Sequence, residues 1–86
     1  MSRVSQSTER KVKEAILYTL YEAGLKPLYT SSIAIELGRD KEFVRRLLSI
    51  LECQGLVRHV GKRNSRKKCW RLTDTAYQEY GKLVSD

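Results

Sequence analysis

The chain of 86 residues contains little of what defines several common classes of protein. One proline and five glycines are too few for a disordered or low-complexity chain. A single histidine excludes a His-rich metal cluster. No apolar run approaches the ~20 residues of a membrane span, and the N-terminus has no apolar core of a signal peptide. We therefore expect a soluble, cytoplasmic protein (in the host cytoplasm if the source is a virus) with no membrane partner.

Motifs of catalysis are missing as well. Nothing in the sequence resembles a P-loop, a dinucleotide fingerprint or a nucleophile elbow, so we expect no enzyme, no catalytic residue and no cofactor. Cys53, His59 and Cys69 could converge as metal or sensor ligands, but three ligands at such irregular spacing are a weak signal, and we expect no metal site. The two cysteines are expected as free thiols, or as a disulfide if the source is a hyperthermophile. We identify no small-molecule ligand, since so short a chain has little spare volume for a pocket.

Positive charge is present and unevenly distributed. The chain has 17 Lys and Arg against 10 Asp and Glu, a formal net charge of +7. Seven of the basic residues and no acidic residue fall between Arg58 and Arg71, which leaves 17 − 7 = 10 basic residues against 10 acidic ones elsewhere. A charge that served only solubility would be scattered, so this concentration indicates a polyanionic partner.

Hydrophobic periodicity predicts one small α+β domain. Apolar residues recur at helical spacing over 7–23, 30–38, 40–54 and 74–84, whereas "LVRHV" and "CWRLT" alternate as strands and "PLYT" suits a short edge strand. In "CWRLT", Trp70 and Leu72 are expected to point inward. The expected helix N-caps are Ser7, one of Thr30, Ser31 and Ser32, then Asp40, and Thr73 or Asp74.

The segment "VRRLLSILECQGLVRHV", followed at an interval by "WRLT", resembles the winged helix-turn-helix domain of prokaryotic transcriptional regulators. The resemblance is carried by Leu51, Glu52, Gly55, Leu56, Val57, Leu72 and Thr73. It implies a single domain over 1–86, with a three-helix core, a recognition helix at about 40–54, a two- or three-stranded β-hairpin wing at about 57–73 and a C-terminal helix. Regulators of the multiple-antibiotic-resistance and arsenic-repressor types look similar, as do compact archaeal and archaeal-virus regulators, and the sequence does not choose among them.

The predicted recognition helix buries Val44, Leu47, Leu48 and Leu51 and turns a polar face outward. An outward Arg could make paired hydrogen bonds to guanine in the major groove. A plain solvated face, with Glu42 and Arg46 paired at i, i+4, is the alternative. Phe43 is either a boundary residue of the core or a contact to a thymine methyl group. The candidate DNA-binding residues here are Arg39, Lys41, Glu42, Phe43, Arg45, Arg46 and Ser49.

The basic run is predicted to be the tip of the wing. In winged-helix proteins this tip lies along the phosphate backbone or enters a minor groove, and the resemblance implies the same role for Lys62, Arg63, Asn64, Ser65, Arg66, Lys67 and Lys68. We therefore predict sequence-specific binding of double-stranded DNA and a role as a transcriptional regulator. The alternative is a winged-helix module that binds RNA or another protein.

The two terminal helices carry more apolar and aromatic surface than one small core requires. Tyr is favoured at protein interfaces, and related regulators commonly dimerise through terminal helices. We therefore predict a homodimer whose interface uses Leu17, Tyr18, Tyr21, Tyr77, Tyr80, Leu83 and Val84. In the alternative, Tyr77 and Tyr80 only cover the core of a monomer.

Overall fold

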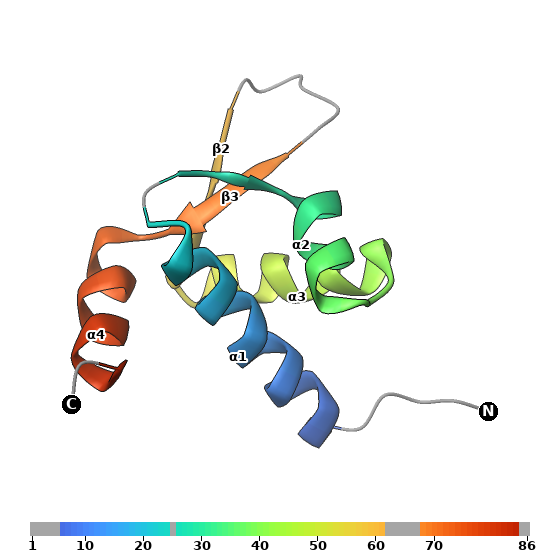
Figure 1. Ribbon diagram of the computed structural model, residues 1–86, viewed down its shortest axis with the longest axis horizontal. Coiled ribbons are helices and arrows are strands. Elements are labelled where there is room, and N and C mark those ends of the chain that lie inside the picture. The colour runs from blue at the N-terminus through green and yellow to red at the C-terminus, as the bar shows by residue number, and fades with distance from the viewer. Residues whose placement is uncertain (1–5, 25, 62–67, 85–86) are drawn as a thin grey trace.

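The computed structural model describes residues 6–24, 26–61 and 68–84. Within them the chain forms four helices and a three-stranded antiparallel sheet, the α+β arrangement predicted from the sequence. The elements are α1 (Gln6–Glu22), β1 (Leu28–Tyr29), α2 (Thr30–Leu37), α3 (Lys41–Cys53), β2 (Val57–Val60), β3 (Cys69–Leu72) and α4 (Asp74–Val84). In Figure 1 the sheet lies above α1, with α4 on the left and α2 on the right.

The sheet has the strand order β1-β3-β2, so β3 is its central strand. Trp70 of β3 lies opposite Leu28 of β1 and His59 of β2, and Leu72 lies opposite Val57. Trp70, Leu72 and Val57 are buried, whereas Cys69 and Arg71 are only half-buried. The predicted inward direction of Trp70 and Leu72 is therefore confirmed.

The core lies between the helices and the inner face of the sheet. It gathers one apolar stripe from each helix, including the predicted stripe of α3, and the inward residues of β2 and β3. Its buried members are Val12, Ile16, Leu20, Ile33, Ala34, Val44, Leu47, Leu48, Leu51, Val57, Trp70, Leu72 and Ala76.

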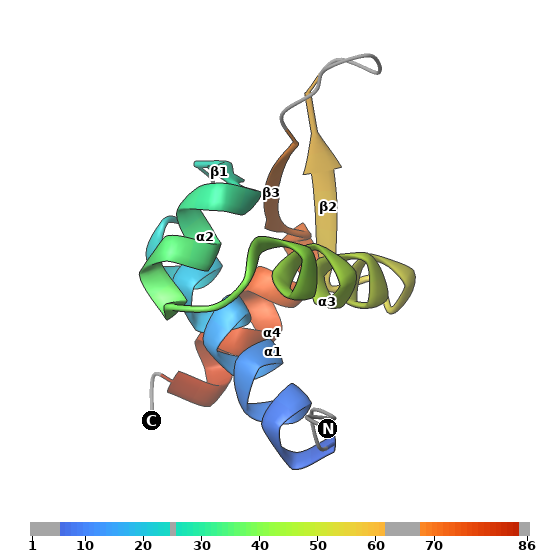
Figure 2. The same cartoon turned by 90° about the vertical axis from the view of Figure 1, so that its right-hand side faces the viewer.

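Both ends of α3 are fixed by local sequence. The Asp40 carboxylate accepts hydrogen bonds from the backbone N–H groups of Glu42 (3.1 Å) and Phe43 (3.3 Å), as expected of an N-cap. At the other end Gly55 has a φ of 79°, and Leu56 N–H donates to the Leu51 carbonyl at 3.0 Å. This left-handed termination turns the chain directly into β2, so α3 and the hairpin are held in a fixed relation. Figure 2 shows the hairpin rising above α3.

Two of the predicted caps are wrong. Ser7 lies inside α1, which already includes Gln6. The N-cap of α2 is Tyr29, without a side-chain cap, because the hydroxyl of Thr30 instead accepts a hydrogen bond from the indole Nε1–H of Trp70 at 2.8 Å. For α4 the prediction is correct, since the Thr73 hydroxyl accepts from Ala76 N–H at 3.2 Å.

Candidate nucleic-acid interface

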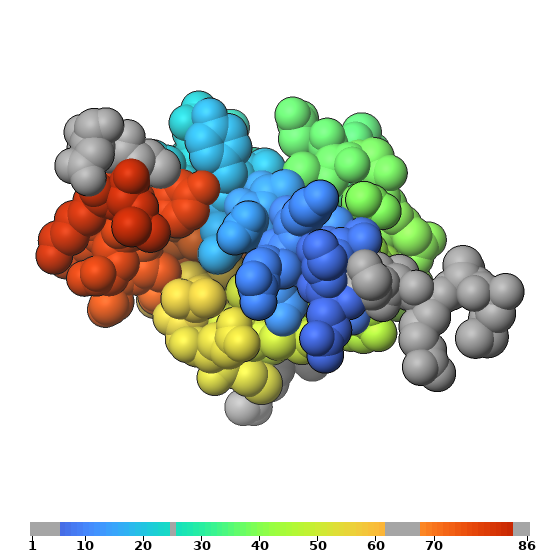
Figure 3. Space-filling view, turned by 90° about the horizontal axis from the view of Figure 1, so that it is seen from below, coloured from blue at the N-terminus to red at the C-terminus, as the bar shows by residue number. Residues whose placement is uncertain are grey.

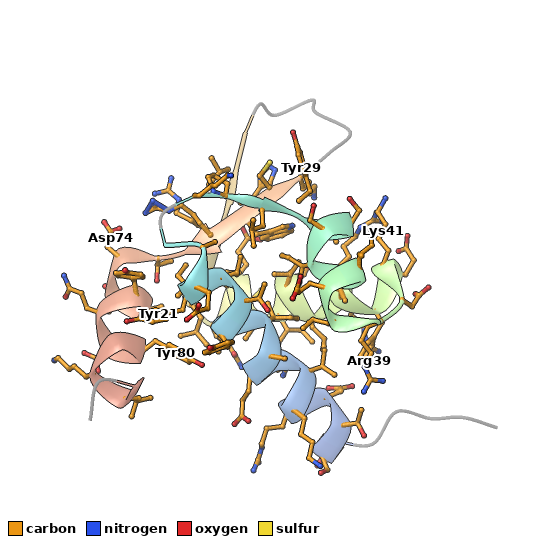
Figure 4. The ribbon with its side chains drawn as sticks, viewed as in Figure 1. Tyr21, Tyr29, Arg39, Lys41, Asp74 and Tyr80 are labelled. Atoms are coloured by element: carbon orange, nitrogen blue, oxygen red, sulfur yellow. The ribbon has the colours of Figure 1, made fainter. Side chains whose placement is uncertain are left out.

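The outward face of α3 is polar, as the burial of its opposite stripe requires. Its side chains are exposed from the turn before the helix to its last turn, and Figure 4 shows Arg39 and Lys41 together on one side of the molecule, where α2 passes into α3. The exposed candidates are Arg39, Lys41, Glu42, Arg45, Arg46 and Ser49. Phe43 differs from them: it is half-buried and packs against the core.

The ion pairs on this face differ from the one in the alternative of a plain solvated face. Glu42 pairs with Arg45, three residues away, at 3.1 Å, and not with Arg46, its partner in that alternative. Arg46 instead pairs with Glu9 of α1 at 3.3 Å, across 37 positions of sequence. Exposed pairs of this kind contribute little to stability, because water screens the charges and two long side chains must be ordered.

Glu9 is a residue of this face that the sequence reasoning missed. Its position in the first turn of α1 indicates only a favourable interaction with the helix dipole. The pair with Arg46 depends on how α1 packs against α3, and no local pattern in the sequence encodes that contact.

Basic residues also lie along the hairpin, and two of them, Arg58 and Arg71, lie on the outer face of the sheet. Arg58 is exposed and lies directly opposite Arg71, an arrangement that is unfavourable for two like charges. Asp74 offsets it, since its carboxylate accepts from the Arg71 guanidinium at 2.8 Å. Lys68 is exposed at the start of the returning strand, and its carbonyl accepts from Thr30 N–H at 3.2 Å. The other predicted wing residues, Lys62, Arg63, Asn64, Ser65, Arg66 and Lys67, lie outside the described residues.

The terminal helices contact each other through aromatic side chains. The ring of Tyr21 lies 5.0 Å from that of Tyr77 and 5.1 Å from that of Tyr80, measured between centroids. Gly81 permits this approach, because a Cβ atom there would lie 3.3 Å from the Tyr21 hydroxyl. The pKa of Tyr80 is raised above its usual value by burial first, and then by the nearby Tyr18, Glu14 and Glu22. Tyr21, Tyr77 and Tyr80 thus contribute to packing within one chain.

Apolar surface remains on the same side of the molecule. Leu83 is 77% exposed and Tyr18 51% exposed, and the side chain of Val84 lies outside the described residues. Beside Leu83 there is a mostly apolar surface cavity of about 330 Å³, lined by Leu17, Leu56, Leu72, Ala76 and Tyr80 among others. Figure 3 shows the face on which α1, α4 and the turn after α3 meet.

Neither cysteine is in a disulfide: Cys53 is an exposed free thiol and Cys69 a half-buried one. Within 6–24, 26–61 and 68–84, no three His, Cys, Asp or Glu side chains come together as metal ligands. The imidazole of His59 packs beside the Trp70 ring, at 5.7 Å between centroids. No helix in the described part of the chain is long and apolar enough to cross a membrane.

Three helices, with α2 and α3 joined by a tight turn, and a β-hairpin that follows α3 define the winged helix-turn-helix fold. The chain matches no known family profile and no curated protein sequence. Solved structures do resemble it. A mutant of MepR from a multidrug resistant S. aureus clinical isolate is 26% identical, with a TM-score of 0.75 over 88% of this chain and 56% of that one.

A MarR family regulator from Neisseria meningitidis is 27% identical, with a TM-score of 0.71 over 85% of this chain and 51% of that one. The Zalpha domain of PKZ from Carassius auratus, solved in complex with Z-DNA, is 28% identical, with a TM-score of 0.66 over 76% of this chain and 97% of that one. This chain thus spans little more than half of the two bacterial proteins but nearly all of the Zalpha domain. The predicted winged-helix fold is confirmed.

Proposed function

We propose that this protein binds double-stranded DNA and regulates transcription. The observation that carries the proposal is an exposed face on α3 in the same domain as the basic Arg58, Lys68 and Arg71 of the hairpin that follows it. The sequence from Arg58 to Arg71 holds seven basic residues and no acid. In this arrangement α3 enters the major groove, where we assign the reading of a base to Arg45, and the hairpin follows the phosphate backbone or a minor groove.

The structural neighbours support the same function. One is described as a MarR family regulator and one as a complex with Z-DNA. Binding of RNA is the main competing function, because a basic hairpin would attract either nucleic acid. The exposed polar face of α3 favours DNA, since the deep and narrow major groove of an RNA duplex does not admit a helix.

The experiment is a binding titration with duplex DNA, duplex RNA and single strands of matched sequence, repeated over a range of salt concentrations. We expect duplex DNA to bind most tightly, with an affinity that falls as salt rises because bound phosphates release counterions. Equal or tighter binding of RNA would replace the proposed function with the alternative. If duplex DNA binds most tightly, selection from random DNA duplexes identifies the preferred site.

A homodimer is proposed as the working form of the protein. Support comes from the exposed Leu83 beside an apolar cavity on the same face, because a two-fold axis there would place Leu83 of each chain against the cavity of the other. The interface would then consist mainly of Leu17, Tyr18, Tyr80 and Leu83, with Tyr21 and Tyr77 behind them. A dimer would also present two α3 helices to one duplex, about one turn (~34 Å) apart.

A further inference from the structure

Arg46 is held from two directions in the free protein. One of its guanidinium nitrogens lies 3.3 Å from a carboxylate oxygen of Glu9, and its guanidinium carbon lies over the ring of Phe43, 5.4 Å from the centroid. The side chain is nevertheless 57% exposed, whereas that of Glu9 is 28% exposed. The Arg46 guanidinium therefore has a fixed surrounding on one side and solvent on the other.

The neighbouring Arg45 is paired in a different way. Its partner is Glu42 on its own helix, and any helix with this local sequence could form that pair. The pair of Arg46 and Glu9 exists only because α1 packs across α3. A guanidinium has five N–H donors in a planar fork, so an ion pair with one carboxylate oxygen leaves donors available for a second anion.

We propose that Glu9 is a positioning residue for DNA binding: with the Phe43 ring, it holds the Arg46 guanidinium so that its remaining donors face a phosphate of the bound duplex. The inference rests on the proposed function. Ordering a long, flexible side chain upon binding costs affinity, and a side chain that is already ordered avoids that loss. Because exposed ion pairs contribute little to folding, the effect of Glu9 should be seen in binding and not in stability.

The test compares Glu9→Ala with Glu14→Ala, a change of an exposed carboxylate on the same helix. Both variants lose one negative charge, which by itself favours DNA binding, so Glu14→Ala measures that general effect. Binding to a duplex of mixed sequence is suitable, because binding of a phosphate does not depend on the operator. We expect Glu9→Ala to bind about two- to tenfold more weakly than Glu14→Ala, as the ordering of one side chain implies.

A second comparison assigns the effect to Arg46. In an Arg46→Ala background, Glu9→Ala and Glu14→Ala should bind equally, because the side chain that Glu9 positions is gone. The signal of the Arg46 Nε–H group in nuclear magnetic resonance should also show greater side-chain motion in Glu9→Ala than in the wild type without DNA. If Glu9 had only a structural role, the difference in affinity between Glu9→Ala and Glu14→Ala would not depend on the presence of Arg46.

Three results would overturn the inference. If Glu9→Ala binds more tightly than Glu14→Ala, Glu9 competes with phosphate for Arg46 instead of presenting it. If the two variants bind equally in the otherwise wild-type chain, Glu9 has no specific role. If the wild type does not bind duplex DNA, the proposed function fails and the inference with it, an outcome that the wild-type titration alone distinguishes from the other two.

Discussion

Arg45 and Arg46 are adjacent in the sequence but differ in what surrounds them. Arg45 has 44% of its side chain exposed and is paired within α3, whereas Arg46 is held at the border of α1 and α3. A side chain that reads a base must reach into the groove, whereas one at the border of the helix is better placed for the phosphate backbone. Removal of each arginine should therefore affect DNA binding in a different way.

We predict that Arg45→Ala costs ~1–3 kcal/mol of binding free energy on a selected site and much less on mixed-sequence duplex. Arg46→Ala should weaken both complexes similarly and flatten the slope of log K against log[salt] by roughly 0.9. Titrations on the two duplexes at several salt concentrations measure both effects. Lys82→Ala, on α4, is the control for removal of one positive charge. If Arg46→Ala lost more of the preference for the selected site over mixed-sequence duplex than Arg45→Ala, Arg46 would be the residue that reads a base and Arg45 the one that binds phosphate.

The indole N–H of the buried Trp70 donates a hydrogen bond to the Thr30 hydroxyl at 2.8 Å. Thr30→Val should lower the free energy of unfolding by about 1–3 kcal/mol, because the indole N–H would then be buried without this acceptor. Urea unfolding measures the change. Thr75→Val, at an exposed position of α4, is the control. Equal stabilities of the two variants would mean that water or a shifted partner replaces the Thr30 hydroxyl.

At the scale of the elements, the hairpin should supply a large share of the sequence-independent affinity. Replacing Arg63, Arg66 and Lys67 with Ala should flatten the salt slope by roughly 0.9 for each phosphate that the variant no longer binds. The control replaces Arg10, Lys11 and Lys82, three basic residues of the terminal helices, and so matches the change in net charge. If the hairpin variant and this control had the same salt slope, the basic run would bind no phosphate and would be only solvated charge.

α3 could be predicted closely from the sequence because each of its determinants is local. The Asp40 cap, the stripe from Val44 to Leu51 and Gly55 after its end all lie within one short segment. The start of α2 could not be predicted in the same way. The Thr30 hydroxyl can cap a helix or accept from the Trp70 indole, and residue 70 is 40 positions away. Propensity describes what Thr30 can do, whereas tertiary packing decides what it does.

The ion pairs illustrate the same limit on the candidate site. Sequence spacing correctly placed the charged residues of α3 on an exposed face, since period alone separates them from the buried stripe. The alternative of a solvated face paired Glu42 with Arg46, because only residues three and four apart on one helix can be compared from local sequence. The actual partner, Glu9, became available when α1 packed against α3.

At the scale of the whole molecule, the predicted DNA face and the surface of the terminal helices lie apart. Figure 4 shows Arg39 and Lys41 on one side and Tyr80 and Asp74 on the other. A second copy bound through α1 and α4 would therefore leave the α2–α3 side accessible. The rings of Tyr21, Tyr77 and Tyr80 already pack against one another within one chain. The test of a dimer must therefore use residues that still face solvent.

Leu83 and Ile35 allow a matched test of the dimer, because both are large apolar residues that are mostly exposed, at 77% and 81%. Only Leu83 lies beside the cavity between α1 and α4, whereas Ile35 lies on α2. We expect sedimentation at micromolar concentration to give twice the 10.0 kDa of one chain for the wild type and for Ile35→Glu. Leu83→Glu should sediment as a single chain, because it places a charge where the partner's apolar surface would lie. A wild type that stays at the mass of one chain as concentration rises would contradict the dimer. Dissociation by Ile35→Glu and not by Leu83→Glu would move the interface to α2.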